Sequence, residues 1–261
     1  MKEARPVLAL DFDGVLCDST EECIVTAWNG WLSYQGKPGF FWDPREVPEP
    51  YQSCIRRLRG YVRTGGEYLV LIRAAEKGWP IQSQREYEEA VSSVGAETRS
   101  YEKAFFAARD KMRHEDESRW FDLHVVYNGV PEKLQRLWSE FNVVVVTGKD
   151  SEAVQTFLRS FRLSLDPGRI YDKDAAHDKL EAVRRAASET GWPLEQIALL
   201  DDNIVHLLPV QKAGCRVFMA EWGYHTDEHL ETAKANEVPV VSLENWDDEI
   251  RRACGGKARG V

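Results

Sequence analysis

The stretch that decides the fold is Val7-Leu8-Ala9-Leu10-Asp11-Phe12-Asp13-Gly14. Four apolar residues run without interruption into two aspartates that are separated by one residue, and a glycine closes the segment. A short apolar run that ends in a turn signal is typical of a strand buried on both faces, as in a parallel sheet. In such a sheet Asp11 and Asp13 would lie at the carboxyl edge, where α/β proteins bind their ligands.

The same pattern recurs further along the chain. One apolar run ends in Thr147-Gly148 and another in Asp201-Asp202, and weaker runs cover residues 215–219 and 238–241. Helical spacing of apolar residues fills the intervals, over 131–138, 151–162 and 179–190. Strands that alternate with helices imply βαβ crossovers. The sequence therefore predicts an α/β protein with a three-layer α/β/α, Rossmann-like parallel sheet core.

The alternation is interrupted after the first strand. From about residue 18 to residue 128 no comparable strand run occurs, and aromatic and charged stretches such as 84–94 are typical of helices. A chain of 261 residues is long enough for a core and a smaller second domain. We expect residues 1–17 and 129–261 to form the α/β core, and residues 18–128 to form a mainly helical domain inserted after the first strand.

The composition excludes several classes of partner. With 43 acidic against 34 basic residues and a net charge of -9, nucleic acid is not expected as the main partner. No segment approaches the run of about 20 apolar residues that crosses a membrane. Five scattered cysteines without a CxxC pair favour reduced thiols and a cytoplasmic location. Nothing in the sequence specifies an oligomeric state.

Carboxylates gather at two of the expected strand ends. Asp11 with Asp13, and Asp201 with Asp202, would be costly to bury together unless a cation lay between them. Carboxylate oxygens suit Mg²⁺, which usually keeps several waters and binds a substrate phosphate. One carboxylate could then attack phosphorus while another handles the proton of the leaving oxygen.

Donors to a phosphoryl group follow at the ends of other predicted elements. Thr147 offers a hydroxyl and Gly148 an unshielded backbone N–H at the end of a strand. Lys179, at a predicted helix start, is the leading candidate for a cation beside the phosphate, and Lys173 is its rival. Each of these features is common alone, but their order at successive strand ends indicates one phosphate-handling site.

Together these segments resemble the motifs of the haloacid dehalogenase superfamily of phosphohydrolases. The first motif is Asp11-Phe12-Asp13-Gly14, the second is Val143 to Thr147, the third is Lys179 and the fourth is Asp201-Asp202. The inserted helical region is similar to the helical cap of this superfamily. The aromatic segment Trp222-Gly223-Tyr224 is similar to a segment found in family members near the phosphoglycolate phosphatases.

The resemblance implies a role for each motif residue. Asp11 would be the nucleophile that forms an aspartyl-phosphate, and Asp13 would act as general acid and then as the base that activates water. Thr147 would bind the phosphoryl group, and Lys179 would neutralise charge on that group and on Asp11. Mg²⁺ would be held by Asp11, the backbone carbonyl of Asp13, and one or both of Asp201 and Asp202.

We therefore expect an Mg²⁺-dependent phosphatase that hydrolyses a small phosphorylated metabolite. A phosphomutase with the same aspartyl-phosphate chemistry is one alternative, and a non-catalytic binding protein on the same fold is another. Dehalogenase chemistry is disfavoured, because attack on a carbon–halogen bond needs no proton donor at the position of Asp13.

Arginines of the inserted region suggest a second interaction. Arg56, Arg59 and Arg63 would fall near one face of a helix that Gly65-Gly66 follows, and this face could bind a further anionic group of the substrate. The favoured alternative is a solvated basic face that pairs with acidic residues of the protein surface.

Overall fold

The computed structural model describes residues 5–176 and 178–255. The chain divides into two compact units, one formed by Met1–Cys17 and Val126–Val261 and the other by Asp18–Val125. The second unit therefore begins at Asp18, and the chain returns to the first unit at Val126. We call these the core unit and the inserted unit.

The core unit is built on a parallel sheet of six strands in the order β5-β4-β1-β6-β7-β8. The strands are β1 (Val7–Leu10), β4 (Asn142–Val146), β5 (Ile170–Tyr171), β6 (Ile197–Asp201), β7 (Arg216–Ala220) and β8 (Val240–Val241). In the sheet register Leu10 lies beside both Val145 and Leu200, so the three central strands end at nearly the same level. This register brings the residues that follow β1, β4 and β6 to one edge.

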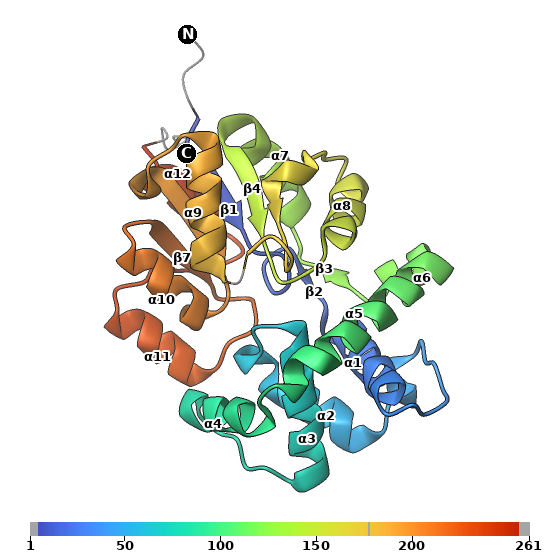
Figure 1. Cartoon of the computed structure of the whole chain (residues 1–261). Coiled ribbons are helices and arrows are strands. Elements are labelled where there is room, and N and C mark those ends of the chain that lie inside the picture. Colours follow the sequence, from blue (N-terminus) through green and yellow to red (C-terminus); the bar gives the residue numbers. More distant parts are fainter. Residues whose placement is uncertain (1–4, 177, 256–261) are drawn as a thin grey trace. The chain divides into compact units, whose positions relative to one another are not determined.

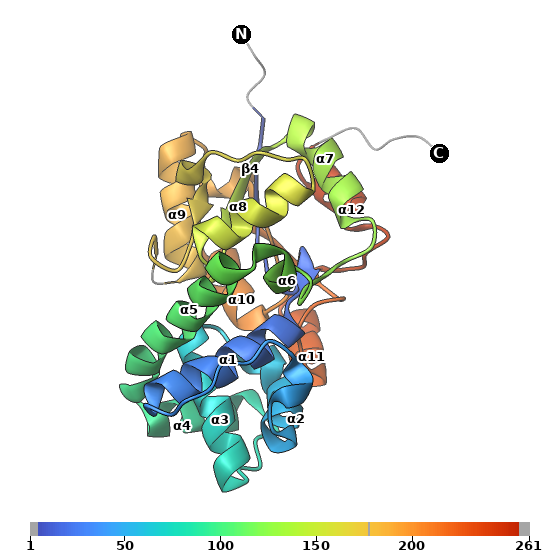
Figure 2. The same cartoon turned by 90° about the vertical axis from the view of Figure 1, so that its right-hand side faces the viewer.

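Helices cover both faces of this sheet (Figures 1 and 2). One face carries α9 (Lys179–Thr190), α10 (Ile204–Lys212) and α11 (Asp227–Ala235), whose apolar side chains join one buried cluster with the strands. The other face carries α7 (Val130–Glu140), α8 (Ser151–Ser160) and α12 (Trp246–Ala253). The predicted three-layer α/β fold is confirmed.

Local signals explain why α9 places its first residue at the sheet edge. The carboxylate of Asp178 accepts a hydrogen bond from the Glu181 N–H and caps the helix, which therefore begins at Lys179. Gly191 ends the helix in the left-handed conformation, with φ of 72°. The predicted helix over 179–190 is therefore found with its predicted bounds.

The inserted unit is helical around an aromatic core. Its helices are α1 (Thr20–Tyr34), α2 (Glu49–Leu58), α3 (Tyr68–Lys77), α4 (Gln84–Val94), α5 (Glu97–Glu115) and α6 (Glu117–Phe121). The buried cluster includes Trp31, Tyr61, Tyr87 and Tyr101. Two short strands, β2 (Cys17–Asp18) and β3 (Val125–Val126), pair where the chain passes from one unit to the other.

A buried ion pair joins α1 to α5 in the inserted unit. Arg109 donates from Nε to Glu22 Oε1 at 2.7 Å and from Nη2 to Oε2 at 2.8 Å. The Thr26 hydroxyl and the Trp120 indole N–H also donate to Oε1. The carboxylate thus meets a guanidinium through two parallel bonds, the strongest arrangement for such a pair.

The expectation of one arginine face is wrong, because α2 ends at Leu58. Arg59 begins a separate 3₁₀ turn, and Arg63 lies beyond it outside any helix. Arg56 instead pairs with Glu21, and Arg63 pairs with Glu67 at 2.8 Å. The Arg56–Glu21 pair is solvated, as the favoured alternative expects, whereas the Glu67 partner of Arg63 is buried.

Two further expectations concern the whole chain. All five cysteines are free thiols, and four of them are buried. No helix within residues 5–176 and 178–255 has both the length and the apolar character needed to cross a membrane.

Candidate active site

The centre of the site is Asp11, which follows the central strand β1. Its backbone N–H donates to Leu200 O at 2.9 Å and so extends the β1–β6 ladder by one residue. Its Oδ1 accepts the Phe12 N–H at 2.6 Å and lies 2.7 Å from Lys179 Nζ. Among the described residues both of these contacts fall on Oδ1, so Oδ2 is the oxygen available for other chemistry.

Lys179 serves two carboxylates. Its Nζ lies 2.7 Å from Asp11 Oδ1 and 3.0 Å from Asp201 Oδ2, and it donates to Val146 O at 2.6 Å. All three side chains are buried. Lys173, the rival lysine, pairs instead with the neighbouring Asp174 on the surface. The structure therefore brings Lys179, and not Lys173, to the expected strand ends.

The charges in this cluster are unbalanced. Burial raises the pKa of Asp11 to about 6, since Lys179 offsets the desolvation only in part and the Asp201 charge adds to it. Burial also acts on Asp201, but Lys179 and His206 outweigh it and hold the pKa of that carboxyl below its usual value. Burial disfavours the Lys179 ammonium, yet the two carboxylates raise its pKa. One lysine therefore faces two carboxylates.

Asp13 forms an ion pair with a different lysine, Lys149. Lys149 Nζ lies 3.1 Å from Asp13 Oδ1, and the Lys149 side chain is 0% exposed, whereas that of Asp13 is 18% exposed. The sequence analysis missed Lys149. The only signal was its position two residues beyond Thr147, and a single lysine after a turn is normally solvated.

Thr147 and Gly148 lie where the sequence predicts, directly after β4. The Thr147 N–H donates to Tyr171 O at 3.0 Å, and its hydroxyl oxygen accepts the Lys149 N–H at 3.1 Å. Thr147 is buried and Gly148 is exposed. The exposed glycine leaves its backbone accessible at the same sheet edge as Asp11 and Asp201.

Asp202 links the loop after β1 to the loop after β7. Its Oδ2 accepts the Tyr224 N–H at 2.6 Å. A Cβ added to Gly14 would lie 1.9 Å from this oxygen, and one added to Gly223 would lie 2.3 Å from the Asp202 Cβ. These two glycines let both loops pack directly on Asp202.

The donor set at the sheet edge fits Mg²⁺. One ligand atom each from Asp11, Asp201 and His206 lies within 4.8 Å of the others. Asp201 Oδ2 is buried and makes no aligned hydrogen bond, although Lys179 Nζ lies near it. Two buried carboxylates against one ammonium leave a net negative charge that a hard cation with oxygen ligands would neutralise. His206, which the sequence analysis did not select, lies 3.4 Å from Asp201 Oδ1 through Nδ1 and so contacts a candidate metal ligand.

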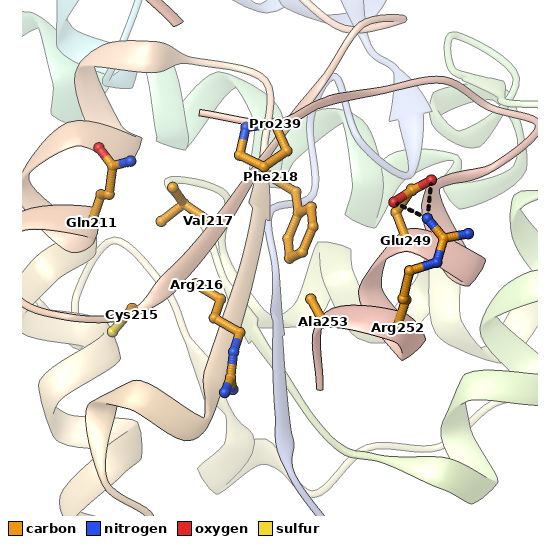
Figure 3. A pocket seen from close by; sticks show the side chains of 9 residues that line it. All are labelled: Gln211, Cys215, Arg216, Val217, Phe218, Pro239, Glu249, Arg252 and Ala253. Atoms are coloured by element: carbon orange, nitrogen blue, oxygen red, sulfur yellow. Dashed lines mark hydrogen bonds and ion pairs between the residues drawn. The ribbon is translucent and has the colours of Figure 1, made fainter. Parts of the chain in front are cut away.

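A separate cavity of about 390 Å³ lies beside the beginning of β7 (Figure 3). Its lining includes Arg216, Val217 and Phe218 of β7, together with Glu249 and Arg252 of α12. The candidate catalytic residues follow the carboxyl ends of the strands, whereas this cavity lies at an amino end. It is therefore distinct from the candidate active site.

Comparisons with known proteins agree with the fold. The structure resembles a predicted phosphatase from Clostridium acetobutylicum, with a TM-score of 0.61 and 17% identity over 96% of this chain and 100% of that one. It also resembles a predicted phosphoglycolate phosphatase from Haemophilus somnus 129PT (TM-score 0.61, 16% identity, 96% and 100% covered). A haloacid dehalogenase-like family hydrolase from Streptococcus pneumoniae is similar too (TM-score 0.56, 16% identity, 95% and 98% covered).

No curated protein sequence gives a significant match. A family model of the haloacid dehalogenase-like hydrolases, however, matches residues 6–214, which is most of the chain and spans all four motifs. The resemblance inferred from the motifs is thereby confirmed, and the chain belongs to the haloacid dehalogenase-like hydrolases.

Proposed function

We propose that this hydrolase is an Mg²⁺-dependent phosphatase that releases phosphate from a small phosphorylated metabolite through an aspartyl-phosphate on Asp11. The observation that carries the proposal is the unbalanced cluster of Asp11, Asp201 and Lys179 at the carboxyl edge of the sheet. Two buried carboxylates around one ammonium make a poor structural pair, but they suit a site that takes a metal cation and a phosphate.

In the first half of the reaction Asp11 Oδ2 attacks phosphorus, while Phe12 N–H and Lys179 hold Oδ1. A P–O bond forms to Asp11, and the bond to the leaving oxygen breaks. The leaving oxygen takes a proton from Asp13, which lies two residues further along the same loop. The Thr147 hydroxyl and the Gly148 backbone N–H act as donors to the phosphoryl oxygens.

In the second half a water molecule attacks phosphorus of the aspartyl-phosphate. Asp13, now a carboxylate, accepts the proton of this water, and the P–O bond to Asp11 breaks to restore the Asp11 carboxylate and release phosphate. Lys179 stays within reach of Asp11 and balances its charge in both halves. The same carboxyl group thus gives and then recovers one proton.

We assign the metal ligands to Asp11, the Asp13 backbone carbonyl, and Asp201 or Asp202. A bound Mg²⁺ would neutralise the repulsion between the carboxylates and the phosphate and polarise the phosphoryl oxygens. Asp201 lies with Asp11 in the cluster, whereas one oxygen of Asp202 already accepts the Tyr224 N–H. Asp201 can therefore contribute directly.

Residues 18–128 are proposed to act as the helical cap that selects the substrate. The substrate class is a small phosphate monoester. Because one similar structure is described as a predicted phosphoglycolate phosphatase, 2-phosphoglycolate belongs in the substrate panel. Substrate identity would depend on the inserted unit, since the core residues contact the phosphoryl group common to all candidates.

The test is phosphate release from a panel of phosphorylated metabolites, with MgCl₂ or with EDTA, by wild type, Asp11→Asn and a control variant, Asp122→Asn. Asp122 is an exposed aspartate of the inserted unit. We expect release that requires Mg²⁺, survives in the control and is lost in Asp11→Asn. Absence of release from every compound would refute the phosphatase assignment, and transfer of phosphate between positions of one sugar would establish a mutase.

A further inference from the structure

Lys149 is a fully buried lysine that the mechanism above does not use. It lies in the turn between β4 and α8, and its side chain is 0% exposed. Burying an ammonium group costs several kcal/mol even after the protein relaxes around it. A lysine in a turn could instead reach water through its long flexible stem. Contacts of the Lys149 ammonium must therefore offset the cost of its burial.

The Lys149 ammonium contacts the loop that follows β1. Its Nζ lies 3.1 Å from Asp13 Oδ1 and 5.4 Å from the centre of the Phe12 ring. The side chain therefore reaches from the end of β4 to the loop after β1. Its ammonium group lies close to both the Asp13 carboxylate and the Phe12 ring. The backbone of the same residue donates to the Thr147 hydroxyl oxygen at 3.1 Å. Lys149 thus touches two residues of the candidate active site.

The two buried lysines of the site divide its carboxylates between them. Lys179 contacts Asp11 and Asp201, whereas Lys149 contacts Asp13. Asp13 is also the more exposed partner of its pair, so the Asp13–Lys149 contact holds the carboxylate from the protein side. A carboxylate that is fixed through one oxygen turns less freely about its side-chain bonds. Such restraint favours proton transfer, which requires a donor within hydrogen-bond reach of the reacting oxygen.

We propose that Lys149 is a positioning residue that orients Asp13 toward the leaving oxygen. This inference rests on the proposed phosphatase function, in which Asp13 gives a proton to that oxygen. In this role Lys149 acts through Asp13 and not directly on the substrate. Its removal should therefore weaken protonation of the leaving oxygen and leave the attack by Asp11 in place.

Two aryl esters of matched shape separate these effects. Phenyl phosphate releases a basic phenolate that needs a proton, while p-nitrophenyl phosphate releases a stabilised nitrophenolate that leaves without one. General acid catalysis contributes about 10²- to 10⁴-fold when the leaving group needs it. We expect Lys149→Met to lower kcat/KM for phenyl phosphate at least about tenfold more than for p-nitrophenyl phosphate. Lys149→Arg, which keeps a donor and a charge, should restore part of the lost ratio.

The double variant tests whether Lys149 acts through Asp13. Asp13→Asn should show the same selective loss, and adding Lys149→Met to it should cause little further loss. Lys173→Met is the matched control, because this lysine pairs with Asp174 on the surface. If Lys149→Met does not fold, Lys149→Gln and Lys149→Arg make the same comparison between the two esters.

The outcomes distinguish the two proposals. Wild type that hydrolyses neither ester in Mg²⁺ refutes the phosphatase assignment. Active wild type with an equal loss on both esters in the Lys149 variants refutes the positioning role and leaves the phosphatase assignment intact. Additive losses in the double variant also refute it. Selective, non-additive loss establishes Lys149 as the residue that positions Asp13.

Discussion

Each unit of this protein buries charged side chains, but the two clusters are built differently. In the inserted unit one carboxylate, Glu22, meets one guanidinium, Arg109, through two hydrogen bonds, and Thr26 and Trp120 donate to the same carboxylate. In the core unit one ammonium, Lys179, lies between two carboxylates. The first cluster is balanced in charge and rich in donors, whereas the second is neither.

The difference is the one expected between a structural pair and a functional site. A buried ion pair is tolerated when hydrogen bonds satisfy both partners, as they do at Glu22. In the core cluster burial raises the pKa of Asp11, and the charge of the second carboxylate, Asp201, adds to this rise. Such an arrangement costs stability and is typical of sites whose charges are completed by a ligand. The four predictions that follow test this contrast.

The largest effect is expected from Lys179→Met. Loss of the shared ammonium removes the cation beside Asp11 in both half-reactions. We expect kcat with the best panel substrate to fall about 10³-fold or more, the range for loss of a preorganised electrostatic contact. Arg109→Met, the cation of the structural pair, should change kcat of the folded protein much less. Similar losses in kcat from both variants would contradict the distinction between the clusters.

Arg109→Met should instead lower stability. It leaves the buried Glu22 carboxylate without its guanidinium, and breaking a buried pair in this way costs about 3–5 kcal/mol. Urea unfolding in EDTA measures the change in the free energy of unfolding. The double variant Glu22→Gln/Arg109→Met should recover part of the loss, because it buries no unpaired charge. No recovery would show that packing, rather than charge, governs this cluster.

Asp11→Asn should raise the free energy of unfolding at neutral pH, whereas Arg109→Met lowers it. In the native state Asp11 has a pKa of about 6, above the ordinary 3.8, so the native protein holds this proton more tightly than the unfolded chain. Its contribution to stability is therefore present at low pH and lost as the pH rises from 4 to 6. The loss is about 3 kcal/mol and is absent from Asp11→Asn. Urea unfolding of both proteins in EDTA at pH 4 to 7 measures it, and a constant difference would contradict the shift.

The smallest effect is stabilisation by Mg²⁺. In the proposed function Mg²⁺ completes the unbalanced cluster, so MgCl₂ at 10 to 100 times its Kd should stabilise wild type by about 1–3 kcal/mol at pH 7.5. Thermal unfolding with MgCl₂ and with EDTA should differ in Tm by several degrees. Asp201→Asn should lose the shift, and Glu22→Gln should keep it. Retention of the shift in Asp201→Asn would place the cation elsewhere.

The strand ends were predictable because parallel strands bring their carboxyl ends to one edge. The apolar runs before Asp11, Thr147 and Asp201 sufficed for this, and the spacing of apolar residues placed Lys179 at the start of its helix. Substitution of one motif residue by another type would have weakened the family resemblance at once. Chemistry that depends on position along a strand is therefore readable from sequence.

Other features depend on contacts between distant loops. Lys149 meets Asp13 across 136 positions of sequence, and no local pattern records which loop a lysine side chain will enter. His206 reaches Asp201 only because α10 starts directly after β6. The short strand β5 has two residues, which is too few for a periodic signal. The prediction that Arg56, Arg59 and Arg63 share one helix face was wrong because α2 ends at Leu58, before Arg59 and Arg63.

The close packing of Gly14 and Gly223 on Asp202 has a consequence for mutational scanning of this enzyme. Neither glycine carries a group that could take part in chemistry, yet any side chain at either position would overlap Asp202. Gly14 also has φ of +81°, which other residues rarely adopt. A scan scored by activity alone would rank both glycines with Asp11, the proposed nucleophile. A parallel scan scored by abundance of folded protein would separate residues needed for the reaction from glycines needed for close packing.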